Sequence, residues 1–188
     1  EDGVHWGKTG QPLLIESGET PPADSEGKWA GGFLRPSLLW DKGRWRLWFD
    51  YWHSSHGTCM GYAENTGDFG ASGGFRVMHD LDRPLMYNWP NPDVIRVGDR
   101  YHAFADPIGY PGMRDDPNAV WTSRQLCEAV SPDGIRWEIV GYIAPDDDTP
   151  ALHVPQALVT EREGRKWLYL FHATQVGLRT GGETYDYR

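Results

Sequence analysis

Side chains that could transfer protons or bind hydroxyl groups recur at matching positions along the chain. Three of them end strand-like runs, and three stand at or just before the start of the preceding runs: Asp50, Asp106 and His172, and Arg35, Asn91 and His153. Carboxylates act as general acids and bases, and the planar fork of arginine binds carboxylates or hydroxyl groups. We expect Asp50 and Asp106 to be catalytic and the other four residues to bind substrate.

The spacing of these residues brings them to one place if the runs are paired strands. Asp50 and Asp106 are 56 residues apart, and His172 follows 66 residues after Asp106. In an antiparallel pair, the end of the second strand lies beside the start of the first. The six side chains are therefore expected around one end of the fold. An alternative stays open, in which Arg35 and Asp50 form an ion pair within one hairpin and Asp106 caps its own loop.

Three predicted hairpins carry these residues. The first spans residues 33–52, with an apolar run, a turn at Asp41-Lys42-Gly43 and a second run rich in Trp, Leu and Phe. The pattern returns at 91–106 and 155–172, and the prolines Pro36, Pro92 and Pro155 are 56 and 63 residues apart. Runs of this kind between turn signals are typical of strands, and their recurrence at a similar spacing predicts a repeat architecture.

A second repeated feature is the pattern Asp-Gly-x-x-Trp, which begins at Asp2 and again at Asp133. The aspartate side chain caps a tight turn, the glycine takes a positive φ, and the tryptophan opens the next strand. Each repeat then holds four strands, which predicts an all-β fold, a β-propeller of four-stranded blades. A β-sandwich with accidental spacing is the alternative.

The predicted boundaries treat residues 1–188 as one partial propeller domain. It consists of an outer strand at 1–15, blades at 33–80 and 91–143, and an incomplete blade at 153–188. Propellers close with roughly 4 to 8 blades. About three blades of a probable five therefore predict a piece of a longer protein, or a ring whose missing blades come from other chains.

Composition excludes several kinds of partner. The net charge of -9 argues against nucleic acid, whose phosphates require a basic surface, and no apolar run is long enough to predict a membrane partner. Cys59 and Cys127 fall on corresponding strands of neighbouring repeats, so we expect two buried thiols and no disulfide framework. The tryptophans at repeated strand positions are expected in the core: Trp6, Trp45, Trp48, Trp137 and Trp167.

Together, the x-Pro-x-(apolar)4 strand, the aromatic-rich second strand and the Ser-x-Asp-Gly-x-x-Trp turn resemble one family over nearly the whole chain. It is the five-bladed propeller glycoside hydrolases of the arabinanase and xylosidase type, related to fructanases and mannoside phosphorylases. The resemblance implies acidic residues at the heads of the innermost strands, around a central tunnel, where carboxyl groups cleave a glycosidic bond. Here Arg35, Asn91 and His153 occupy or approach those positions, so the family's acid and base cannot be transferred to them. Asp93 follows Pro92, but alternation turns its side chain to the other side of the strand.

Other residues near the same end are candidates for substrate contact. Trp52, Trp89 and Trp121 lie in or beside predicted loops, where they either stack on sugars or anchor the loops. His53 and Arg124 fall at strand connections on the same side. No residue is assigned as a metal ligand and no cofactor is expected, although the resemblance allows a structural calcium ion in the tunnel.

The sequence therefore predicts a carbohydrate-active propeller, a glycoside hydrolase that binds a terminal or side-chain sugar of an oligosaccharide or polysaccharide at the tunnel mouth. One alternative is a propeller that binds carbohydrate without cleaving it. A second is a sialidase-like enzyme in which Arg35 belongs to an arginine cluster. We expect an extracellular or periplasmic location.

Overall fold

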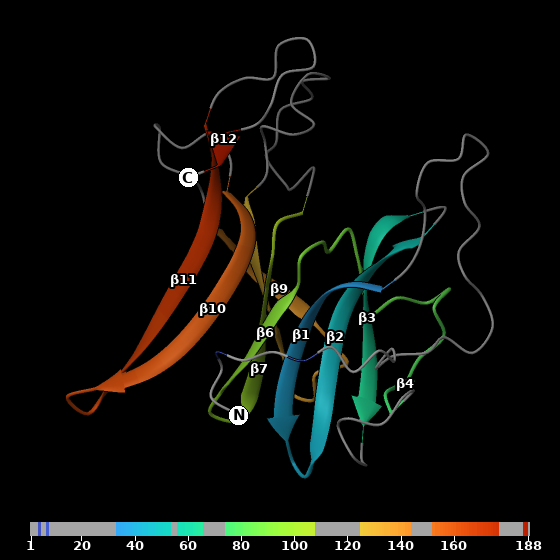
Figure 1. Cartoon of the computed structure of the whole chain (residues 1–188), viewed down its shortest axis with the longest axis horizontal. Helices are drawn as coiled ribbons and strands as arrows, with labels where there is room; N and C mark the ends of the chain where they lie inside the picture. The colour runs from blue at the N-terminus through green and yellow to red at the C-terminus, as the bar shows by residue number, and fades with distance from the viewer. Residues whose placement is uncertain are drawn as a thin grey trace.

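The computed structural model of the chain describes residues 4, 7, 33–53, 56–65, 74–107, 125–143, 152–176 and 186–187. All the regular elements among them are β-strands, arranged in three separate antiparallel sheets (Figure 1). Within this part of the chain, no helix is long and apolar enough to cross a membrane.

Each sheet begins with a long or regular hairpin and adds further strands on one side. The first sheet has β1 (Phe33–Asp41), β2 (Arg44–His53) and β3 (Gly57–Asn65), and both β4 (Arg76–Val77) and β5 (Met86–Tyr87) pair with β3. The second runs β6 (Asp93–Val97), β7 (Arg100–Ala105), β8 (Leu126–Ser131) and β9 (Glu138–Ile143), and the third β10 (Leu152–Arg162), β11 (Arg165–Val176) and β12 (Asp186–Tyr187). The predicted all-β fold of consecutive antiparallel blades is confirmed.

The first strands of the three sheets, β1, β6 and β10, lie next to one another, with β6 in the middle. Asp93 of β6 joins them: its Oδ1 accepts from Ser37 Oγ of β1 at 3.2 Å, and its Oδ2 accepts from the backbone N of Ala157 of β10 at 2.5 Å. Ser37 Oγ also accepts from the backbone N of Val94 at 2.8 Å. The sheets thus fan out from a shared line of innermost strands, as in a propeller and unlike two stacked layers.

The same irregularity recurs at the head of each innermost strand. Arg35, Asn91 and Val154, each followed by proline, have φ values of 47°, 52° and 50°. Positive φ is uncommon for residues other than glycine. In the first and third sheets, a register shift follows at once, between Leu34 and Ser37 and between His153 and Gln156. Such bulges re-aim side chains at the rim of a sheet, and here they set the direction of the residues around the candidate site.

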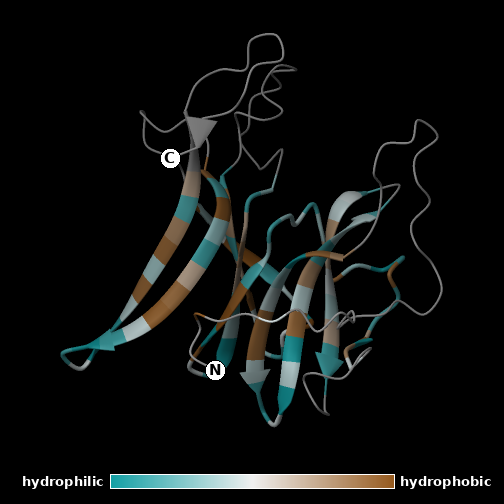
Figure 2. Cartoon of the chain, in the orientation of Figure 1, coloured by the Kyte–Doolittle hydropathy of each residue, from teal (hydrophilic) through white to brown (hydrophobic). Residues whose placement is uncertain are grey.

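The main hydrophobic core fills the space between the first and second sheets. Trp48, Met60 and Tyr62 of the first sheet pack there against Tyr101 and Ala103 of β7. Side chains alternate along β2, so Trp48 and Asp50 face the second sheet while Leu47, Phe49 and Tyr51 pack on the other side. In Figure 2, parts of the β2, β10 and β11 ribbons are brown, the colour of hydrophobic residues. The core prediction is confirmed for Trp48.

The other tryptophans predicted in the core differ from one another. Trp137 packs against the main core and Trp45 against the smaller one. The prediction is wrong for Trp167, which is 48% exposed because no described element covers its part of β11. Trp6 lies outside the described residues. Cys59 and Cys127 are buried free thiols, as expected, and burial raises the pKa of each to about 11.

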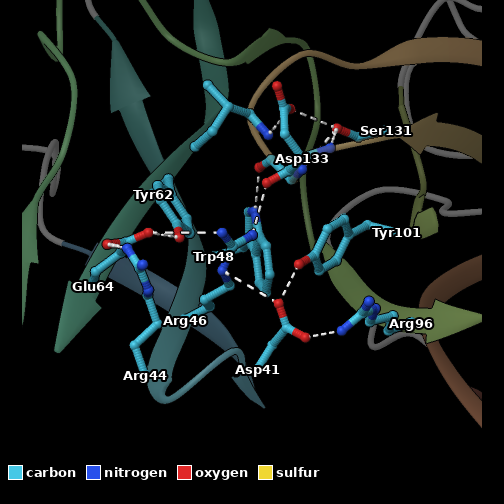
Figure 3. Close-up of polar contacts among 12 residues, drawn as sticks. Asp41, Arg44, Arg46, Trp48, Tyr62, Glu64, Arg96, Tyr101, Ser131 and Asp133 are labelled. Carbon is cyan, nitrogen blue, oxygen red and sulfur yellow. Dashed lines mark hydrogen bonds and ion pairs between the residues drawn. The ribbon is translucent and has the colours of Figure 1, made fainter. Parts of the chain in front are cut away.

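The predicted Asp-Gly turn is present at Ser131 to Gly134 and rests on the preceding sheet. Asp133 Oδ1 accepts from the backbone N of Ile135 and Arg136, at 2.9 Å each, and Gly134 has a φ of 81°. Arg46 Nη1 donates to Asp133 O at 2.7 Å and Trp48 Nε1 to Gly134 O at 2.9 Å (Figure 3). The turn therefore fixes the second sheet against the first.

A charged cluster surrounds this contact, which we call the Asp41 network: Asp41, Arg46, Arg96 and Tyr101 (Figure 3). Asp41 accepts hydrogen bonds from Tyr101 and Arg96, and Arg46 Nε lies 3.8 Å from its Oδ2. The Arg46 guanidinium also lies over the Tyr101 ring, 5.0 Å from its centroid. This network ties β1 and β2 to β6 and β7 at one end of the strands.

Candidate functional site

A second polar cluster lies at the opposite end of the same hairpins, with Asn91 at its centre. Asn91 donates its backbone N–H to Asp50 Oδ2 at 2.9 Å and its side-chain Nδ2 to Asp106 Oδ1 at 2.6 Å. Its Oδ1 accepts from Arg35 Nη1 at 2.9 Å. We call the cluster of Arg35, Asp50, Asn91, Asp106 and His153 the Asn91 network. It draws residues from all three sheets to one place.

Arg35 is the cation of this network, and it is both held and accessible. Its Nε lies 2.8 Å from Asp50 Oδ2, and its side chain is 42% exposed. Two of its three nitrogens are therefore fixed, by Asp50 and Asn91, while Nη2 forms no hydrogen bond or ion pair with a described residue. A guanidinium fixed in this way presents a free N–H edge to a hydroxyl or carboxylate group of a ligand.

Asp50 lies beneath Arg35 and is fully buried, with 0% of its surface exposed. Burial raises the pKa of this carboxyl, and the nearby Asp106 adds to the rise, although the Asn91 N–H and the Arg35 charge oppose it. Its Oδ1 is buried without a hydrogen-bond partner among the described residues. A buried acceptor without a hydrogen bond lowers the free energy of unfolding, so Asp50 Oδ1 makes this network less stable than a fully paired one.

Asp106 and His153 form the other half of the network. Asp106 is also 0% exposed, and its Oδ2 contacts the Nδ1 of His153. The His153 side chain remains 20% exposed. A carboxylate that binds one ring nitrogen fixes the orientation and the tautomer of an imidazole. The network therefore contains two partly exposed side chains, Arg35 and His153. Each is bound by a fully buried carboxylate, Asp50 or Asp106.

The remaining predicted residues divide by position. Trp52 follows Asp50 on the same face of β2 and is 45% exposed, so its ring is accessible. Trp89 is 1% exposed within the main core, so its ring offers no face to a ligand, and the predicted stacking role is wrong for this residue. Trp121 and Arg124 lie outside the described residues.

Two predicted histidines do not join the network in the structure. His172 is exposed, and its Nδ1 lies 3.4 Å from Ala173 O. His53 projects from the opposite face of β2, where its ring lies 4.7 Å from that of His56 and its Nε2 lies 3.8 Å from Asp82 Oδ1. Alternation along β2 separates His53 from Asp50, which explains why nearness in sequence was misleading.

One acidic residue has a role that sequence reasoning did not assign. Asp93 binds β1 and β10 through Ser37 and Ala157, and burial raises its pKa against the opposing hydrogen bonds from these two residues. Its position one residue after Pro92 was the available signal. Alternation correctly separates Asp93 from the Asn91 network, but it does not reveal the contacts with neighbouring strands.

The resemblance to the propeller hydrolases leaves a structural calcium ion possible. Among the described residues, no group of three or more His, Cys, Asp or Glu side chains is arranged to hold a metal ion. Asp50 and Asp106 are instead engaged by Arg35, Asn91 and His153.

Comparison with known proteins gives a likeness in structure only. No family model and no curated protein matches the sequence. An α-L-arabinofuranosidase from Lactobacillus brevis matches with a TM-score of 0.55 and 10% identity over 88% of this chain and 50% of its own. A family 62 glycoside hydrolase in complex with xylotriose matches with a TM-score of 0.55 and 15% identity, over 87% of this chain and 48% of its own.

A third solved structure is a Bombyx mori family 32 β-fructofuranosidase variant in complex with sucrose. It has a TM-score of 0.53 and 14% identity, over 80% of this chain and 32% of its own. The chain thus spans 32% to 50% of the lengths of these three proteins. It has the fold of part of a five-bladed propeller glycoside hydrolase, as the sequence pattern predicted.

Proposed function

We propose that this chain is part of a carbohydrate-active propeller that cleaves glycosidic bonds, and that a sugar binds over the Asn91 network. The observation that carries the proposal is the convergence of three sheets on one polar cluster with an accessible guanidinium. Arg35 presents a side chain that is 42% exposed, and Trp52 presents a ring that is 45% exposed on the face of β2 that also carries Asp50. Sugars offer hydroxyl groups to the first and flat C–H faces to the second.

Within this proposal, Asp50 and Asp106 position other residues. Hydrolysis with two carboxyl groups requires both to reach the scissile bond, one as an acid and the other as a base or nucleophile. Each of these aspartates is 0% exposed, and each holds a surface residue, Arg35 for Asp50 and His153 for Asp106. The catalytic roles expected for them from the sequence are therefore not retained in the proposal.

A second candidate function is carbohydrate binding without cleavage. The complete burial of both aspartates favours it, because an ion pair between Arg35 and Asp50 supports a binding surface without supplying a carboxylate to a substrate. The two functions share the same surface and differ in turnover. Incubation with arabino-, xylo- and fructo-oligosaccharides, followed by chromatography of the products, distinguishes them.

The test of the shared surface is a binding titration with that oligosaccharide panel, by calorimetry, using the wild-type chain, Arg35→Gln and Arg76→Gln. Arg76 is an exposed arginine on β4 that belongs to neither network, so it controls for the loss of one positive charge. We expect Arg35→Gln to weaken binding by about 10-fold to 100-fold, the usual cost of losing a hydrogen bond to a charged group. We expect Arg76→Gln to bind normally. Equal affinity in Arg35→Gln and the wild type would overturn the proposed surface.

A further inference from the structure

We propose that a second copy of this chain docks head to tail on the third sheet. In Figure 1 the first and third sheets lie on opposite sides of the second, which contacts both. The proposed contact joins the side of the third sheet that faces away from the second sheet, the trailing face, to the opposite side of the series in another copy, the leading face on β1. It uses no residue of the Asn91 network, so it is independent of the proposed function.

One hydrogen bond recurs between neighbouring sheets. The side chain one residue after the proline of an innermost strand accepts from the backbone N–H two residues after the next proline. Ser37 Oγ accepts from Val94 N at 2.8 Å, and Asp93 Oδ2 accepts from Ala157 N at 2.5 Å. The first sheet is joined to the second, and the second to the third, by the same pair of positions.

The two ends of the series carry matching groups at these positions. Gln156, which corresponds to Ser37 and Asp93, is exposed and has an amide oxygen that can accept a hydrogen bond. Leu38, which corresponds to Val94, has a backbone N–H that can donate one. A contact between Gln156 of one copy and Leu38 of another would therefore repeat the hydrogen bond found twice within the chain.

Side-chain exposure shows that the trailing face lacks the cover that equivalent faces have. The residue paired with the position after the proline is Trp48 in the first sheet, Phe104 in the second and Phe171 in the third. Trp48 and Phe104 are 0% and 1% exposed, whereas Phe171 is 56% exposed. The second sheet covers Trp48, and Phe171 lies where a following sheet would cover it.

The leading face shows the reverse pattern. Two residues after the proline, Val94 and Ala157 are 3% and 9% exposed, whereas Leu38 of the first sheet is 39% exposed. Leu38 pairs with Leu47, which packs on the side of the first sheet away from the second. Trp40 lies two residues further along the same side of β1 and is 55% exposed. The first sheet therefore leaves open the positions that the other two sheets bury.

The trailing face is a continuous apolar stripe. The rings of Tyr169 and Phe171 stack with centroids 6.4 Å apart, and the two residues are 43% and 56% exposed. Leu158 pairs with Tyr169 across the hairpin and is 51% exposed. Adjoining exposed apolar side chains of this kind mark an interaction surface. A second copy fits this surface because it carries Leu38 and Trp40 at the positions that pack on a preceding sheet.

The expected assembly is a dimer. A contact between two unlike faces either closes into a ring or grows into an open chain of copies. Two copies together supply six sheets, twice the three of one chain, and propellers close with roughly 4 to 8. A closed pair covers the trailing face and the leading face of both copies.

The test is sedimentation velocity of the whole chain at several concentrations, with the wild type, Phe171→Asp, Leu38→Asp and Leu168→Asp. Leu168 is 51% exposed on the opposite side of β11, so it is the matched control. We expect the wild type to sediment at twice the 21.3 kDa mass of the chain. Phe171→Asp and Leu38→Asp should each raise the dissociation constant at least about 30-fold, the cost of losing an interface hot spot. Leu168→Asp should leave it unchanged.

A mixture of Phe171→Asp and Leu38→Asp tests the head-to-tail arrangement itself. In a pair of identical variants, every contact contains one substitution. In a mixed pair, one contact contains both substitutions and the other contains none. The mixture should therefore form dimers at concentrations where neither variant does so alone. A dimer that joins two trailing faces would be weakened by Phe171→Asp, unaffected by Leu38→Asp and not restored by mixing.

Several outcomes would overturn the proposal. A wild-type chain that stays monomeric would show that the trailing face is covered by something other than a second copy. Growth into a ladder of larger species would show that the contact does not close. An equal loss of dimer in Leu168→Asp, or no restoration on mixing, would contradict the proposed faces. The three replaced side chains are exposed, so the variants should fold, which circular dichroism checks. If one variant fails to fold, the wild-type mass and the other variant still decide.

Discussion

The Asn91 network and the Asp41 network lie at opposite ends of the same two hairpins, β1–β2 and β6–β7, and both join buried carboxylates to arginine. They differ in how fully the carboxylate is paired. Burial acts to raise the pKa of Asp41, but the hydrogen bond from Tyr101 and the charges of Arg96 and Arg46 outweigh it, and the pKa is lowered. The pKa of Asp50 is raised, and its Oδ1 has no described partner.

The contrast separates a structural cluster from a candidate binding site. At the Asp41 end, two arginines and a tyrosine converge on one carboxylate. The Asp-Gly turn of the second sheet accepts hydrogen bonds there from the side chains of Arg46 and Trp48. At the Asn91 end, two buried carboxylates hold one arginine and one histidine whose side chains are 42% and 20% exposed. The Asp41 carboxylate is paired on both oxygens, although Arg46 Nε and Arg96 Nε are buried without a hydrogen-bond partner among the described residues. The difference between the two ends therefore lies in the pairing of the carboxylates and in the exposure of the residues that they hold.

The largest effect is expected from Gly134→Ala, which attacks the turn that supports the Asp41 end. A Cβ there would lie 2.8 Å from the Trp48 ring and 2.9 Å from Arg46 Nη1, at a φ of 81°. Strain at positive φ and a clash with a packed ring together should cost about 4 kcal/mol in the free energy of unfolding by urea. Gly98→Ala is the control, because its φ is 65° but its Cβ meets nothing within 4 Å, and it should cost only about 1 kcal/mol. An equal loss of unfolding free energy in the two variants would show that the close approach of Gly134 to Trp48 and Arg46 does not contribute to stability.

Asp41→Asn should follow, with a loss of about 3 kcal/mol at neutral pH, because it removes the charge that Arg46 and Arg96 share. A carboxyl group whose pKa is lowered on folding contributes stability above its unfolded pKa, near 3.8, and loses it as the pH falls through the folded value. The difference between wild type and Asp41→Asn in urea unfolding should therefore shrink below about pH 3.8. Asp99→Asn, at an exposed turn position, should be neutral throughout.

Asp50→Asn should show the opposite pH dependence. A carboxyl group whose pKa is raised on folding costs stability as the pH climbs from the unfolded pKa through the folded value, and the asparagine variant avoids that cost. Relative to the wild type, Asp50→Asn should therefore gain stability as the pH rises above the unfolded pKa, near 3.8, measured by urea unfolding. A relative loss over this range would mean that Asp50 resembles Asp41 and that the contrast between the two ends is wrong.

The smallest effect on stability is expected from Trp52→Ala. Its ring is 45% exposed, so its removal should cost less than about 0.5 kcal/mol, whereas Trp89→Ala should cost about 3 to 5 kcal/mol because that ring is buried in the core. Trp52→Ala should nevertheless weaken oligosaccharide binding about threefold to tenfold, measured by calorimetry. Unchanged affinity would show that Trp52 does not contact the sugar, and the proposed surface would then consist of Arg35 and His153.

The repeat spacing predicted much of the fold and part of the site. A 56-residue interval was sufficient to place Arg35 and Asp50 beside Asn91 and Asp106, because equivalent positions of successive hairpins meet around the innermost strands. The same reasoning failed for His172. The residue after each proline pairs with Trp48, Phe104 and Phe171, so the position of Asp50 and Asp106 is taken by Ala173 on β11. His172 lies one residue earlier, and alternation turns it to the other face of the strand.

The Asp41 network could not be predicted in this way, since its contacts join positions that no repeat interval relates. Arg46 reaches the carbonyl of Asp133 across 87 residues, and Tyr101 reaches Asp41 across 60. The burial of Asp50 and Asp106 could not be predicted either, because the sequence shows that a residue is acidic but not whether its carboxyl group is exposed. The sequence predicted the Asp-Gly turn from its local pattern, but not the sheet on which the turn rests.

The most direct test of the difference between the two ends is a nuclear magnetic resonance titration of the whole 188-residue chain with oligosaccharides of arabinose, xylose and fructose. We expect saturable shift changes at Arg35, Asn91 and His153, and none at Asp41, Tyr101 or Asp133. Shift changes confined to the Asp41 end, or no saturable change with any sugar, would contradict the proposal that the Asn91 end binds carbohydrate.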